Sequence, residues 1–134
     1  MTVDKVFGPI DISVSGMRAH DQSMEVISSN IANARTIDAG QGKPYRRLEA
    51  LLRSENEGVS GVVVDNVVPD MSALQRIYDP GNPKADATGY ITMPNVQLPV
   101  EMMNLGVASR AYQANAAILK RYQKMVETTL ELLR

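Results

Sequence analysis

The prolines of this chain leave two long stretches in which a helix can run without interruption. Pro9 stands alone near the N-terminus, the other prolines fall between Pro44 and Pro99, and none follows. Proline breaks a helix interior because it lacks an N–H donor and clashes with the preceding turn. The distribution therefore predicts an N-terminal helix over residues 10–34 and a C-terminal helix over residues 100–134.

Both stretches carry apolar residues at heptad spacing, which is typical of a coiled-coil seam. In the first stretch the repeat is Ile10, Met17, Met24 and Ile31, with Ile27 between the last two. In the second stretch the repeat is Leu105, Tyr112, Leu119, Val126 and Leu133. At about 1.5 Å per residue the helices would be roughly 37 and 52 Å long, which is too extended for a small globule. We expect a coiled-coil-like bundle.

The segment between the helices is rich in turn formers and β-branched residues, which predicts short strands. We expect strands over residues 45–53, 59–68, 74–78 and 90–93. The predicted fold class is therefore mainly α with a small β insert. We expect an axial helical domain from residues 1–34 plus 100–134, and a loop with a small β module over residues 35–99.

Composition excludes several classes of function. The 14 basic and 15 acidic residues form no long run of one sign, so we expect no nucleic-acid partner. The chain has no cysteine, hence no disulfide and no thiolate nucleophile or ligand. No stretch approaches the roughly 20 apolar residues that span a bilayer, and the N-terminus lacks the pattern of a signal peptide.

No catalytic motif is visible, and we expect no enzyme activity, cofactor, metal ion or small-molecule substrate. His20, the single histidine, stands beside Asp21, so a small hydrolase using this pair is the alternative from another class. The acidic residues Asp65, Asp70, Asp79 and Asp86 do not match the spacing of a calcium loop. Turn formation and solvation explain them better.

The two ends carry motifs of a known family. Near the N-terminus these are Ser15-Gly16-Met17-Arg18-Ala19 and Ser28-Ser29-Asn30-Ile31-Ala32-Asn33-Ala34, followed by Thr36. Near the C-terminus they are Glu101-Met102 and Ala108-Ser109-Arg110-Ala111-Tyr112-Gln113-Ala114-Asn115. Together they resemble the terminal signatures of the flagellar rod and hook proteins, and the resemblance covers nearly the whole chain.

The middle of the chain resembles the short proximal rod proteins within that family. The resemblance rests on the segment from Tyr78 to Asp86, with Gly89-Tyr90 and Pro94-Asn95-Val96 after it. The signature loop is Tyr78, Asp79, Pro80, Gly81 and Pro83. The segment from Thr36 to Tyr45 departs from hook-type relatives in being longer. A second kind of short proximal rod protein, with similar ends, remains the nearest alternative.

The resemblance implies a structural subunit of the proximal rod, part of the tube that transmits torque. Implied partners are further copies, proximal and distal rod proteins, basal-body ring and rod-adapter proteins, and the flagellar type III export apparatus. The implied location is the basal body in the periplasm, after export without a cleavable signal peptide.

Apolar faces on two long helices need neighbours to cover them, which predicts an interface between chains. The predicted assembly interface comprises Met17, Met24, Ile27, Asn30, Ile31, Asn33, Leu105, Tyr112, Asn115, Leu119, Tyr122, Val126, Leu130 and Leu133. The amides of Asn30, Asn33 and Asn115 have two explanations: they fix helix register in a seam, or they stand at a helix end or on the surface.

Overall fold

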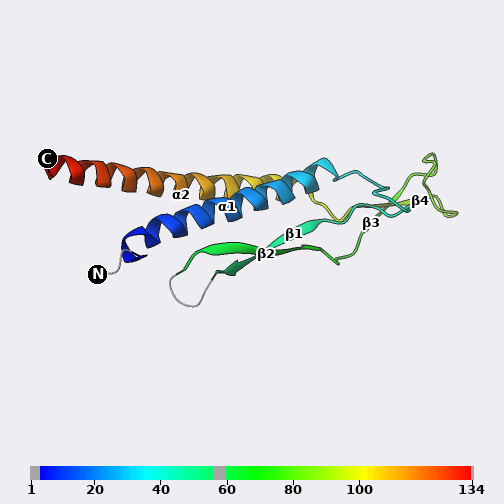
Figure 1. Cartoon of the computed structure of the whole chain (residues 1–134). Coiled ribbons are helices and arrows are strands. Elements are labelled where there is room, and N and C mark those ends of the chain that lie inside the picture. The colour runs from blue at the N-terminus through cyan, green and yellow to red at the C-terminus, as the bar shows by residue number, and fades with distance from the viewer. Residues whose placement is uncertain (1–3, 56–59, 134) are drawn as a thin grey trace.

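The structure, a computed structural model, describes residues 4–55 and 60–133 (Figure 1). Its elements are α1 (Asp4–Ala32), β1 (Leu48–Ser54), β2 (Val62–Pro69), β3 (Gln75–Tyr78), β4 (Tyr90–Met93) and α2 (Leu98–Leu132). The predicted fold class is confirmed: two long terminal helices enclose a small β insert. The predicted strand start at Val59 and helix end at Arg134 lie outside the described residues.

Both helices begin before the prolines that were predicted to precede them. α1 begins at Asp4 and contains Pro9, and α2 begins at Leu98 with Pro99 in its first turn. The first N–H groups of a helix have no partner within the helix, so a proline there removes little. Pro9 removes only one backbone hydrogen bond inside α1. Both helices therefore begin earlier than the proline positions predicted.

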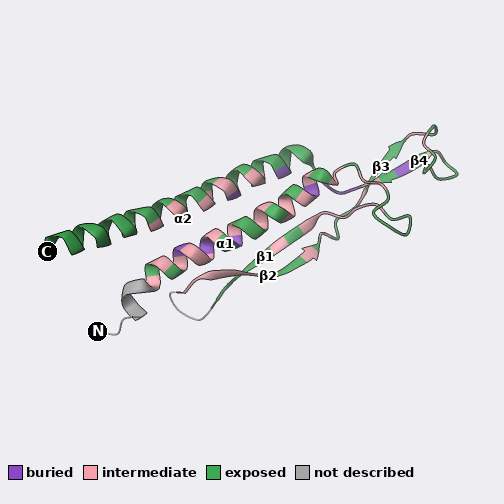
Figure 2. Cartoon of the chain, turned by 45° about the horizontal axis from the view of Figure 1, so that its top comes forward, coloured by how far each residue is buried: buried purple, intermediate pink, exposed green. Residues whose placement is uncertain are grey.

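The two helices lie side by side and antiparallel, as Figures 1 and 2 show. A Cβ atom added to Gly16 would lie 2.8 Å from Nδ2 of Asn115, so the backbone of α1 comes close to α2 there. At the other end of the pair, Asn30 donates to Glu101. The two contacts show that the helices run in opposite directions. The C-terminal end of α2 extends past the start of α1 (Figure 1).

The β insert consists of two separate hairpins. β1 pairs with β2 in antiparallel register from Leu48↔Pro69 to Ser54↔Val62, with an irregularity between Leu51 and Leu52. β3 pairs with β4, also antiparallel. The first hairpin leans on α1, where the backbone N–H of Val62 donates to Oγ of Ser15 (3.1 Å). α1 therefore lies between α2 and the β1–β2 hairpin (Figure 1).

The apolar core of the described chain is small. Its buried apolar side chains are Ala19, Ile91, Pro94, Val96 and Ala108. α1 is mostly buried or half-buried because it has two neighbours, whereas much of α2 is exposed (Figure 2). No helix within residues 4–55 and 60–133 is long and apolar enough to cross a bilayer.

Candidate assembly site

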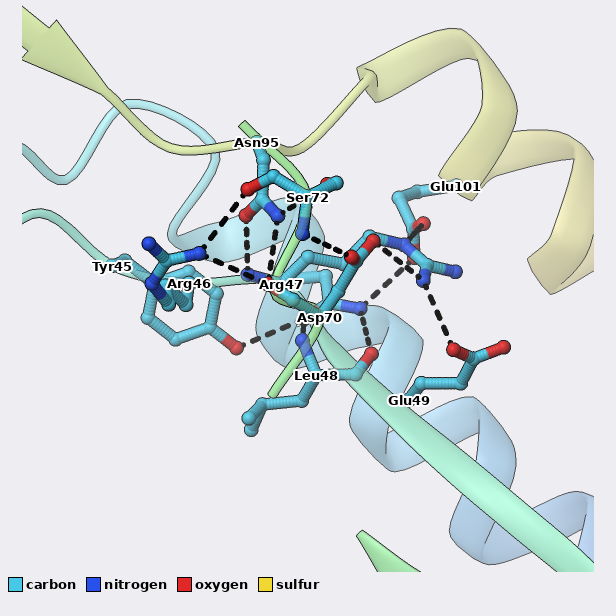
Figure 3. A network of polar contacts seen from close by, with 10 residues as sticks. Tyr45, Arg46, Arg47, Leu48, Glu49, Asp70, Ser72, Asn95 and Glu101 are labelled. Atoms are coloured by element: carbon cyan, nitrogen blue, oxygen red, sulfur yellow. Dashed lines mark hydrogen bonds and ion pairs between the residues drawn. The ribbon is translucent and has the colours of Figure 1, made fainter. Parts of the chain in front are cut away.

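Glu101 is the centre of a buried polar junction where the helices meet the β insert (Figure 3). It lies in the first turn of α2 and is 1% exposed. Arg47 Nε donates to its Oε1 (2.7 Å), and Asn30 Nδ2 donates to its Oε2 (3.1 Å). A carboxylate taken out of water is tolerated when both oxygens are paired, and a helix N-terminus favours negative charge. The pair with Glu101 also raises the pKa of Arg47.

Asn30 joins the end of α1 to the start of β1. Its Nδ2 donates to the carbonyl of Leu48, and its Oδ1 accepts from the backbone N–H of Leu48, both at 2.8 Å. The hydroxyl of Tyr45 also donates to Oδ1 (2.9 Å). Asn30 is fully buried, so its amide fixes register within the chain.

Asn95 fastens the other side of the same junction. Its Oδ1 accepts from the backbone N–H of Arg47 (2.9 Å). Its Nδ2 donates to the carbonyl of Asp70 and to Oγ of Ser72. The pKa of Asp70 is lowered because its carboxylate accepts from the N–H and the hydroxyl of Ser72. These bonds join residues 70–72, between the two hairpins, to the segment that precedes α2 (Figure 3).

The signature loop from Tyr78 to Pro83 connects β3 to β4, and the residue that organises this connection is Asp86. Its Oδ1 accepts from the N–H and the hydroxyl of Thr88 and from the N–H of Tyr90. Arg76 pairs with its Oδ2 at 2.6 Å. These contacts, chiefly the Thr88 hydroxyl, lower the pKa of Asp86 to about 2.

Two aromatic rings and a glycine complete this hairpin. The rings of Tyr78 and Tyr90 meet edge to face with centroids 5.2 Å apart. Gly89 has φ 82°, and a Cβ there would lie 2.8 Å from Cε2 of Tyr78. Only glycine fits both the backbone conformation and the space. The hairpin is therefore held largely by its own local contacts.

The long loop after α1 packs on this hairpin. Asp38 accepts from the N–H groups of Gly40 and Gly42, and its other oxygen pairs with Lys84. The pKa of Asp38 is lowered, first of all by the bond from Lys84. A loop whose conformation could not be predicted from sequence is thus folded onto the end of the β insert.

Most of the predicted interface residues are half-buried. This group is Met17, Met24, Ile27, Ile31, Asn33, Leu105, Tyr112, Asn115, Leu119 and Tyr122. Leu105, Tyr112 and Leu119 lie at helical spacing from Glu101, Ala108 and Asn115, hence on the side of α2 that faces α1. Val126, Leu130 and Leu133 are 40%, 63% and 80% exposed. A role for either group between chains stays a prediction.

Asn33 stands at a helix end. Its Nδ2 donates to the carbonyl of Ser29, and its Oδ1 accepts from the hydroxyl of Thr36. It therefore closes the last turn of α1 and positions the loop that follows. This matches the second of the two explanations for the amides.

A further exposed face of α2 was not among the predicted residues. It comprises Met103, Val107, Ile118, Met125 and Leu132, all strongly exposed. Their spacing places them on one side of the helix, away from Glu101 and Ala108. We call this set the outer stripe. Ile118, Met125 and Leu132 repeat at heptad spacing, so the sequence held a signal for it.

The described residues contain no group of three or more His, Cys, Asp or Glu that could hold a metal ion. The buried polar side-chain atoms of residues 8–55 and 60–133 all have hydrogen-bond partners. The arrangement is suited to packing and positioning.

Comparison with known families gives matches at both helices. Residues 10–36 match the model described as flagella basal body rod protein. Residues 87–132 match the model described as flagellar basal body rod FlgEFG protein C-terminal. Paired terminal helices with these two matches define an axial protein of the bacterial flagellum.

Curated relatives narrow this class. The flagellar basal-body rod protein FlgC of Salmonella typhimurium is 38% identical, over 91% of this chain and 93% of the relative. FlgC of Agrobacterium fabrum is 36% identical over 98% of both chains. FlgC of Yersinia enterocolitica is 37% identical over 91% and 93%. The chain belongs to the FlgC family of flagellar basal-body rod proteins.

Proposed function

We propose that this chain is a structural subunit of the proximal rod, which assembles with copies of itself and with other rod proteins into the tube that transmits torque. The observation that carries the proposal is the outer stripe of α2. Met103, Val107 and Leu132 are 64%, 63% and 83% exposed in a chain with few buried apolar side chains. Apolar surface of this extent is typical of an interaction site.

The helical pair and the β insert have different tasks in this proposal. The axial helical domain, residues 1–34 plus 100–134, forms the wall of the tube. The module of residues 35–99 contacts neighbours outside that wall. The junction of Asn30, Arg47 and Glu101 fixes one part against the other, because its hydrogen bonds join α1, the start of β1 and α2. Torque then passes through many packed contacts.

The remaining expectations from the sequence belong to the same proposal. The subunit is exported by the flagellar type III apparatus without a cleavable signal peptide and assembles in the periplasm. It contacts basal-body ring and rod-adapter proteins, and it catalyses no reaction. The balanced charge argues against a nucleic-acid partner, and the absence of a catalytic motif supports a role without catalysis.

The test is complementation of a non-motile deletion strain with the full chain carrying a small tag. We expect restored motility and the tagged chain in purified basal bodies. The chain found only in the cytoplasm would refute the proposal. His20→Ala separates the hydrolase alternative: it should leave motility intact, whereas a catalytic His20 would be required for it.

A further inference from the structure

α2 carries a basic, apolar outer surface over much of its length. Arg110, Lys120, Arg121 and Lys124 are exposed, and no acidic residue occurs from Met102 to Val126. On a helical wheel at 100° per residue, Arg110 and Arg121 fall beside the outer stripe. The outer stripe, Arg110 and Arg121 together form a surface that α1 of the same chain does not cover.

α1 carries a surface of opposite charge beside a groove. Asp11, Asp21 and Glu25 are exposed along α1, with Arg18 as the opposing cation. Next to them lies a groove of about 640 Å³ between α1 and the β1–β2 hairpin. Apolar residues on its walls are Val14, Ala19, Val62, Val63 and Val64. Asp11 and Glu55 add negative charge to the lining and Arg18 adds one positive charge, so the lining is net negative. We call this region the acidic groove.

We propose that the outer stripe of α2 in one copy packs into the acidic groove of a second copy. This inference rests on the proposed function and specifies which surfaces of the subunit meet. Charge identifies the partner, because the acidic groove and the cations of α2 are complementary to each other and neither is complementary to itself. Apolar side chains supply the burial, and the flexible methionines adapt to the groove.

The contact has a consequence for assembly. Two different surfaces meet, so each copy keeps one of each kind free after pairing. Such head-to-tail contacts continue from copy to copy and generate rings or helices. The pairing of α1 with α2 inside each chain uses other faces of both helices, so both modes can exist together.

The first experiment reverses charge on each surface of the full chain. One variant carries Arg110→Glu and Arg121→Glu; the other carries Asp11→Lys, Asp21→Lys and Glu25→Lys. We expect each to weaken self-association at low salt by about tenfold or more in sedimentation, equivalent to about 1.4 kcal/mol. An equimolar mixture should recover association, because each variant then meets a complementary surface.

The matched control is Arg53→Glu with Asp65→Lys, which reverses an exposed ion pair on the β1–β2 hairpin. It should associate as the native chain does. Circular dichroism must show equal helical content in all variants. Self-association that is unchanged by the reversals, a mixture that does not recover, or a native chain that stays monomeric would overturn the pairing.

The second experiment uses disulfide trapping, which is clean because the chain has no cysteine. A Gln22→Cys chain is mixed with a Met125→Cys or Ile118→Cys chain, so that mixed disulfides join two copies. We expect mixed dimers under mild oxidation, since a disulfide needs Cα atoms within about 7 Å. Gln113 lies on another face of α2, so a Gln113→Cys chain should give a yield of mixed dimer at least about tenfold lower.

Equal yields from Gln113→Cys and from the outer-stripe positions would contradict the pairing. This failure is distinct from failure of the proposed function. If the native chain enters basal bodies and its charge variants assemble normally, the proposed pairing is wrong but the chain is still a rod subunit. Its copies then meet through another surface. A native chain absent from basal bodies refutes the function itself.

Discussion

Buried charge is tolerated where every polar atom has a partner, and Glu101 satisfies this condition through two different segments. Arg47 comes from the approach to β1, and Asn30 comes from the last turns of α1. The three residues are distant in sequence, so their bonds form only when helices and insert have reached their final arrangement. Buried polar groups of this kind select one arrangement more than they add stability.

Glu101→Ala should lower the free energy of unfolding by about 3 kcal/mol, because it leaves the Arg47 guanidinium and the Asn30 amide without their acceptor. Urea denaturation of the full chain measures the change. Glu131→Ala, at an exposed position of the same helix, should stay within about 0.5 kcal/mol of the native value. Similar small effects from both substitutions would mean that the junction contributes little to the free energy of unfolding.

Gly16 sets the distance between the helices. Gly16→Val should destabilise the chain by about 2 kcal/mol, because the new side chain meets Asn115 and forces the helices apart. Asn115→Ala in the same chain should recover part of the loss. Gly106→Val is the matched control, since a Cβ at Gly106 meets nothing within 4 Å. Equal losses at both glycines in thermal unfolding would argue against a close approach.

At the scale of elements, the two hairpins are stabilised in different ways. The β1–β2 hairpin depends on α1, to which it is joined through Ser15 and Val62. The β3–β4 hairpin depends on its own contacts, centred on Asp86. A two-stranded hairpin is marginal in water, so the anchors of each decide whether it is ordered.

The β3–β4 hairpin should lose order in acid. The pKa of Asp86 is lowered to about 2 in the fold, against about 3.9 for an unfolded aspartate. Its contribution is therefore complete above about pH 4 and disappears as the pH falls through about 2. The NMR signals of the Tyr78 and Tyr90 rings report this local change.

Asp86→Asn provides the control for the acid transition. Its amide cannot ionise, so the tyrosine signals of this variant should resemble those of the acid form at every pH. Rings that keep the native signals below pH 2 in the unsubstituted chain would show that Asp86 does not hold the hairpin.

The sequence predicted those parts of the fold that follow from local pattern. Heptad spacing and proline positions gave both helices, and β-branched runs gave the strands. The close approach at Gly16 and the junction at Glu101 could not be predicted, because each depends on residues far apart in sequence. Asn30 illustrates the limit: its place near a seam was visible, but its bonds to Leu48 require the folded chain.

At the scale of the whole molecule, the chain is an elongated helical pair with a β insert packed along one side and beyond one end (Figure 1). As far as Tyr122, the apolar side chains of α2 that face α1 are half-buried within the chain, whereas the outer stripe is exposed. A subunit of this kind is suited to an assembly in which neighbours cover what remains. The central claim is that the outer stripe is free in a single chain and buried in the rod.

A single cysteine at Val107 tests this claim most directly, since Val107 is 63% exposed and the chain has no other cysteine. The rate of its reaction with a maleimide is measured in the purified chain, diluted until sedimentation shows a monomer, and in isolated basal bodies. We predict fast labelling of the purified chain and at least about tenfold slower labelling in the rod, where water and reagent are excluded. Equal rates in both would contradict the account.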